Sequence, residues 1–159
     1  MKILVIALCM TAAALPAGPS KGFEHFTGAD LQGFAKKLSP KMSAQKVATQ
    51  SLGVFGNHSF LIAHREGNGE AELHETQNDV MVVESGEATL VVGGTVVEGR
   101  TTAPNEVRGS SIRGGEKVAL AAGDVVHIPI GIAHQMLIEN GKQITYFVVK
   151  IDGPKAALQ

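Results

Sequence analysis

The length of 159 residues supports one domain with a buried core and excludes a multi-domain machine. With 14 Lys and Arg against 15 Asp and Glu, the formal net charge is −1, so the chain has no basic field to attract a nucleic acid. The 19 Gly, 6 Phe, single Tyr and absent Trp are typical of short strands joined by many tight turns.

Residues 1–17 have the order of a secretory signal peptide. A short positive head precedes an apolar run from Ile3 to Leu15, and small residues follow. This run is shorter than the about 20 residues that a membrane-spanning helix needs. We therefore expect export to the periplasm or the medium, with cleavage after Ala17 or, alternatively, Ala14, and no membrane attachment afterwards.

The N-terminal segment over residues 18–45 contains a helical pattern between Phe26 and Leu38. Thr27 or Asp30 offers an N-cap, and Pro40 ends the pattern. We expect this helix to cover the core formed by the strands that follow. Its apolar face consists of Leu31, Phe34, Ala35 and Leu38.

From Lys46 the pattern changes to short apolar runs bounded by turn residues. It predicts an all-β barrel or sandwich over residues 46–152, followed by a C-terminal tail over residues 153–159. Gly93-Gly94 and Asn140-Gly141 lie between such runs and favour two-residue hairpin turns. The expected strands are 46–52, 59–65, 71–74, 80–84, 88–92, 95–98, 117–120, 125–128, 135–139 and 143–150.

Residues 99–115 interrupt this rhythm, because Pro104, Gly109 and the pair Gly114-Gly115 stand among polar residues. Loops longer than about 12–15 residues are uncommon in compact domains and are usually functional or disordered. Two interpretations are open for the segment, a mobile surface excursion and a flap over the mouth of a cavity.

The most specific motif is Gly123-Asp-Val-Val-His-Ile-Pro129-Ile-Gly131-Ile-Ala-His134. The glycines and the proline place two sharp turns around a short strand, and the chain returns with His134 at the start of the next strand. This segment resembles the second cupin motif, which reads Gly, five residues, Pro, one residue, Gly, two residues, His. The Asn that closes the family motif is Ile138 here.

A degenerate form of the first cupin motif lies upstream. In the family it reads Gly, five residues, His, one residue, His, three or four residues, Glu, six residues, Gly. Anchored on Gly86, the spacing places Glu72 at the first His, His74 at the second His and Asp79 at the Glu. An alternative register puts His74 first and Thr76 second, but it leaves Asp79 too close.

The resemblance implies a double-stranded β-helix, the jelly-roll barrel of the cupins, with a metal held inside by both motifs. The ligands that it implies are Glu72, His74, Asp79 and His134. Glu72 and His74 are two residues apart, so on a strand both project to one face. Two imidazoles with one or two carboxylates suit a divalent Fe, Mn, Ni or Zn ion.

Simpler roles stand beside these assignments. Glu72 can be a solvent-facing strand residue, and Asp79 can cap a turn. His127 is expected either to orient a substrate or to be structural, and His64 is expected either to line the cavity or to be exposed. Gln77 and Gln135 are the candidate hydrogen-bond donors to a metal ligand, and the sequence does not choose between them.

Function has to be read from the site, because one fold serves many chemistries. The resemblance points to an exported metal-dependent enzyme, an oxygenase, lyase or isomerase, that acts on a small polar substrate able to chelate the ion. Glu72 or Asp79 is the expected general base if it is not a ligand. The alternative is a non-catalytic binding or sensing cupin with a structural metal. Exposed strand edges predict a homodimer in either case.

Overall fold

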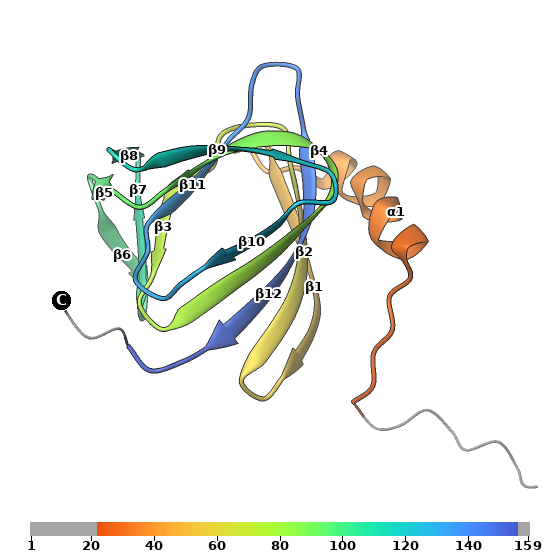
Figure 1. Cartoon of the computed structure of the whole chain (residues 1–159). Helices are drawn as coiled ribbons and strands as arrows, with labels where there is room; N and C mark the ends of the chain where they lie inside the picture. The colour runs from red at the N-terminus through yellow and green to blue at the C-terminus, as the bar shows by residue number, and fades with distance from the viewer. Residues whose placement is uncertain (1–21, 156–159) are drawn as a thin grey trace, which may run out of the picture.

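The computed structural model describes residues 22–155, which form an antiparallel sheet curled into a barrel, with one helix on the outside (Figure 1). The predicted signal peptide, residues 1–17, lies outside the described residues. Across residues 22–155, no helix has both the length and the apolar character needed to cross a bilayer.

The helix α1 (Gly28–Leu38) begins with a reciprocal cap. The Thr27 hydroxyl accepts from the Asp30 backbone N–H at 3.1 Å, and the Asp30 carboxylate accepts from the Thr27 backbone N–H at 3.0 Å. Both candidate caps therefore take part. A short 3₁₀ turn, η1 (Ser39–Lys41), follows and contains the expected Pro40.

Twelve strands follow the helix within the described residues. They are β1 (Val47–Phe55), β2 (His58–Arg65), β3 (Ala71–His74), β4 (Gln77–Val92), β5 (Thr95–Val97), β6 (Arg100–Ala103), β7 (Glu106–Gly109), β8 (Ser111–Arg113), β9 (Glu116–Ala121), β10 (Val125–Ile128), β11 (His134–Leu137) and β12 (Ile144–Asp152). The main sheet has the order β1-β2-β12-β4-β11-β3-β7-β6, and β9 and β10 also pair with β4.

The long strand β4 joins two runs, 80–84 and 88–92, that the sequence analysis wrongly separates. Gly86 adopts a φ of 80°, and just before it the pairing with β12 shifts register, with Glu84 as the extra residue, so a bulge at Glu84 bends the strand without ending it. A Cβ at Gly86 would collide with the carbonyl oxygen of Gln143. The first half of β4 pairs with β10 and β12, and the second half pairs with β9 and β11.

The expectation of an irregular loop or flap over residues 99–115 is wrong. The segment contains β6, β7 and β8; β6 pairs with β7, and β7 pairs with β3. Its glycine and proline content favours a loop, but β3, more than thirty positions upstream, supplies the hydrogen-bonding partners. This arrangement brings the side chains of β7 to the barrel interior beside β3.

Both predicted two-residue hairpins are also wrong. Gly93 and Gly94 have positive φ values of 77° and 74°, as a tight turn requires, but β4 and β5 do not pair across them. Strand β5 pairs with β8 instead. Likewise β11 and β12, which flank Asn140-Gly141, both pair with β4 and not with each other.

Two apolar cores lie on opposite faces of the sheet. Alternate residues of each strand face opposite ways, so Ala63 enters the barrel core while its neighbour Ile62 packs outside. Phe34 and Leu38 of α1 cover Ile62, and Leu38 is only 1% exposed. The helix therefore covers a core on the outer wall and leaves the barrel interior to the site.

Candidate metal centre

The candidate centre lies where β3 and β11 run side by side inside the barrel. Glu72 and His74 are two positions apart on β3, and β11 places His134 opposite Glu72. The turn before β11 is tied to β3, because the Gly131 backbone N–H donates to the His74 carbonyl at 2.8 Å. The turn of the second motif thereby fixes the position of His134 relative to the first motif.

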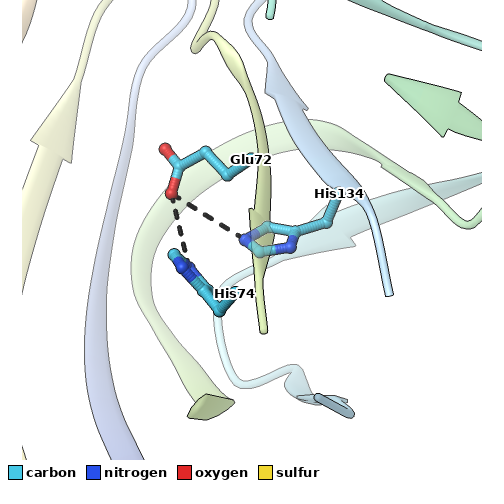
Figure 2. A group of neighbouring side chains, drawn as sticks. All are labelled: Glu72, His74 and His134. Carbon is cyan, nitrogen blue, oxygen red and sulfur yellow. Dashed lines mark ion pairs between the residues drawn. The ribbon is translucent and has the colours of Figure 1, made fainter. Parts of the chain in front are cut away.

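Three side chains converge at this point (Figure 2). The Oε2 atom of Glu72 is 3.6 Å from His74 Nε2 and 3.9 Å from His134 Nε2. Ligand atoms of the three residues all lie within 4.8 Å of one another. His74 is 5% exposed and His134 is 4% exposed. This buried group could hold a metal ion.

The outward atom of each of these side chains is held by the protein. Arg65 and Arg108 contact Glu72 Oε1 at 3.4 and 2.8 Å. His74 Nδ1 donates to the Glu106 carboxylate, and His134 Nδ1 donates to a backbone carbonyl, Ile132 O, at 3.3 Å. Because a carbonyl only accepts, the Nδ1 of His134 carries the proton and its Nε2 faces the centre with a lone pair.

Asp79 reaches the same centre from β4. Its Oδ2 is 3.3 Å from His74 Nε2 and 3.7 Å from His134 Nε2. The Lys150 ammonium, opposite Asp79 on β12, lies 2.9 and 3.1 Å from its two oxygens and 3.0 Å from His74 Nε2. Asp79 is therefore paired with a lysine as well as facing both imidazoles.

No family model and no curated protein matches the sequence. Solved structures do match the fold. One is an uncharacterized conserved protein with a double-stranded β-helix domain from Klebsiella pneumoniae, at 16% identity and a TM-score of 0.56, with 84% of this chain and 94% of that chain covered. Another is a cupin-2 domain from Rhodospirillum rubrum, at 17% identity and a TM-score of 0.50, with 72% and 65% covered. The chain has the cupin fold.

A further cupin-fold match is an oxalate oxidase in complex with glycolate. It shares 15% identity and a TM-score of 0.56 with this chain, and the match covers 89% of this chain and 64% of that one. At such identities the likeness extends to the cupin fold and not to the reaction. The chemistry of this chain has to be argued from its own side chains.

The pKa shifts of the two imidazoles of the candidate centre differ in direction. Burial acts to lower the pKa of His74, but hydrogen bonds to Asp79 and Glu106 outweigh it and raise this pKa to about 9. For His134, burial prevails and lowers the pKa. Burial raises the pKa of Asp79, whereas His74 and Lys150 together lower it more, to about 2. Asp79 is thus an anion at neutral pH.

A cavity of about 240 Å³ adjoins the centre inside the cupin barrel. Its polar lining residues include Glu72, Asp79 and His134, together with Arg65 and Lys150. Seven further lining residues are apolar. The apolar lining residues are Val47, Leu61, Ala63, Met81, Leu90, Met136 and Val148.

The other predicted site residues are divided between the cavity and the outside. Gln135 lines the cavity and donates from Nε2 to Gly69 O at 2.8 Å. Gln77 instead donates to Asp152 at 2.7 Å, outside the cavity lining. His127 is exposed, because its neighbours on β10, Val126 and Ile128, occupy the inner face.

His64 is neither exposed nor part of the cavity lining, so both expected positions are wrong. It is 1% exposed, and its Nδ1 lies 2.7 Å from the Thr145 hydroxyl. Its Nε2 lies 3.3 Å from Glu66, which also accepts from Ser39. His64 lies on the outer face of β2 with Ile62, and Ser39, which follows α1, donates to the same Glu66 that His64 contacts.

The sequence patterns above do not identify several side chains that contact the centre or line the adjoining cavity. Alternation along β12 could have found two, because Tyr146 and Lys150 share the inner face with Ile144 and Val148. The same period places Arg65 on the inner face of β2 with Ala63. No comparable signal marks β7 within its glycine-rich segment. The missed residues are Arg65, Glu106, Arg108, Tyr146 and Lys150.

Proposed function

We propose that this chain is a metal-dependent cupin enzyme that acts on a small polar substrate able to chelate the ion. The observation that carries the proposal is the convergence of Glu72, His74 and His134, each with its outward atom held by a protein partner. Such outer partners orient metal ligands and fix their protonation. Iron, manganese, nickel and zinc are the proposed metals, and oxygenase, lyase and isomerase are the reaction classes.

The donor set fits a divalent transition metal. Glu72, His74 and His134 would hold the ion, and Asp79 is the proposed fourth ligand or a nearby balancing charge. A bound ion would act as a Lewis acid toward a chelating substrate. The lowered pKa of Asp79 makes it a weak base, so the role of general base falls better to Glu72 when it does not ligate.

A second candidate is a non-catalytic, ligand-binding or sensing cupin with a structural metal. The position of Lys150 favours it, since the ammonium contacts both Asp79 and the inward nitrogen of His74. An internal cation at this position competes with a metal ion for two of its donors. Metal bound without turnover on a panel of sugars, hydroxy acids and catechols would support this candidate over the enzyme.

Elemental analysis of tag-free protein tests the metal. We expect about one equivalent of a transition metal per chain in the wild type and little in a His74→Ala, His134→Ala double variant. A His58→Ala, His127→Ala double variant is the matched control, because neither histidine belongs to the centre. Metal-poor wild type, together with an unchanged melting temperature in the first double variant, would contradict the proposal.

Export and dimerisation belong to the same proposal. Export rests on the signal-like order of residues 1–17, and mass spectrometry of the native protein should find Met1 removed. Dimerisation rests on β1, which ends the sheet order and carries the 76% exposed Val54. Sedimentation should give the dimer mass at micromolar concentration, and the monomer mass would refute it.

A further inference from the structure

We infer that the cavity beside the centre binds the carboxylate of a small organic acid through Arg65 and Tyr146. The inference rests on the proposed function and deepens it, because it assigns the substrate to a chemical class. It also names two side chains that recognise the substrate independently of the metal.

Arg65 has donors to spare. Its side chain is 12% exposed, and Nε donates to the Tyr146 hydroxyl at 2.8 Å. Its contact with Glu72 Oε1, at 3.4 Å, is longer than an ordinary N–H···O bond of about 2.7–3.2 Å. A guanidinium has five N–H donors in a planar fork, and this one lines the cavity and makes one short hydrogen bond to the residues within 22–155.

Close packing keeps this guanidinium in place. The Nη1 atom lies so near Gly69 that a Cβ there would stand 3.0 Å from it. Because Gly69 has no side chain, there is room for Nη1 beside it. The Gly69 carbonyl already accepts from Gln135.

Tyr146 contributes an unused proton. It is 5% exposed and lines the same cavity. Its oxygen accepts from Arg65, and among residues 22–155 no acceptor for its own O–H is found. The pair therefore presents donors only, and a ligand that satisfies them has to supply acceptors. A carboxylate matches the planar fork of an arginine and accepts from a hydroxyl as well.

Arg108 binds carboxylates of the protein and not the inferred ligand. Its two terminal nitrogens contact Glu72 at 2.8 Å and Glu106 at 2.6 Å, so it holds carboxylates of the protein. Around the cavity three cationic side chains face four carboxylates, and with His74 in the neutral form that ligates a metal, a divalent ion would leave a net charge of +1 that favours an anionic ligand. These groups are Arg65, Arg108 and Lys150 on one side and Glu70, Glu72, Asp79 and Glu106 on the other.

The apolar lining residues and the cavity volume limit the size and polarity of the rest of the acid. Leu61, Met81, Leu90 and Val148 also line the cavity and give it an apolar surface beside the charged groups. Its volume of about 240 Å³ is below the about 300–1,000 Å³ of sites for drug-sized ligands. The inferred ligand is therefore a monocarboxylic acid with a short branched or cyclic apolar body.

Calorimetry with 2-hydroxy-3-methylbutyrate and its neutral amide tests the inference. Both are titrated into chelator-treated protein and into protein loaded with Zn²⁺. We expect the acid to bind about tenfold more tightly than the amide in both forms, and Tyr146→Phe to remove about tenfold of the acid's affinity. Zn²⁺ affinity of Tyr146→Phe should stay at the wild-type value, which separates ligand recognition from metal binding.

Two further variants complete the design. Arg65→Lys keeps the charge and loses the fork, so it should weaken acid binding if Tyr146→Phe does not fold. Arg113→Met removes an exposed arginine and should change nothing. Zn²⁺ binding with equal affinity for acid and amide, or with neither bound, would overturn this inference and leave the proposed function standing. Acid binding in protein that takes up no metal would support the inference and overturn the proposed function.

Discussion

Replacement of Lys150 by Met should strengthen metal binding. In the structure the ammonium contacts both oxygens of Asp79 and the Nε2 atom of His74, which are donors that an ion would need. Methionine fills a similar volume without a charge. Lys150→Met therefore removes a competitor while Asp79 keeps its position facing His74 and His134.

The size of the effect follows from these contacts. A hydrogen bond to a charged group contributes about 1.5–3 kcal/mol. The ion has to displace such bonds in the wild type and not in the variant. Since each 1.4 kcal/mol corresponds to about a tenfold change, the Zn²⁺ dissociation constant should fall by about 10- to 100-fold.

Calorimetric titration of chelator-treated protein with Zn²⁺ measures this change. Lys142→Met is the matched control, because Lys142 forms an exposed ion pair with Glu87 far from the centre. Its dissociation constant should equal that of the wild type. If folded Lys150→Met binds Zn²⁺ no more tightly than Lys142→Met does, Lys150 does not compete with the ion and our account of the centre is wrong.

Three more predictions concern the ligands, the helix and pH. Glu106→Gln should weaken metal binding by about 10- to 100-fold, whereas exposed Glu116→Gln should leave calorimetric affinity unchanged; equal values for both would contradict the role of Glu106. Leu38→Ala should cost about 2–5 kcal/mol in urea unfolding, with metal stoichiometry retained, because this side chain packs on the outer wall. In chelator-treated protein, the folded-state pKa of His74 lies at about 9, above its ordinary 6.5. The hydrogen bonds that raise this pKa therefore stabilise the folded state fully below about pH 6.5, and this stabilisation is lost progressively as the pH rises to 9. The urea midpoint should fall over that range, and an equal fall in His74→Ala would reject this cause.

Local patterns predict the parts of this fold that depend on neighbours in sequence. The bounds of β3 and β10 are predicted correctly, and the expected strand over 135–139 begins one residue after the observed start of β11 at His134. The two-residue spacing of Glu72 and His74 is enough to place both on one face. These features need no knowledge of the partner strand.

Other features depend on strands that are distant in sequence. The bulge at Glu84, just before Gly86, requires β12 opposite it, and a glycine within polar residues indicates a turn when its partner strand is unknown. The burial of His64 depends on Ser39 and Glu66 folding over it. Lys150 meets Asp79 only through the register of β12 with β4, which composition and periodicity do not specify.

The ladder between β3 and β7 links the ligands to their supports. Glu72 lies opposite Arg108, and His74 lies opposite Glu106. Each of these two candidate ligands is therefore bonded by the side chain directly across from it on β7. A single inserted or deleted residue in β7 would turn both of these β7 side chains to the other face at once. A substitution at one of these four positions therefore has to be matched by a compatible side chain at the position opposite it. Insertions and deletions are tolerated only outside this pair of strands.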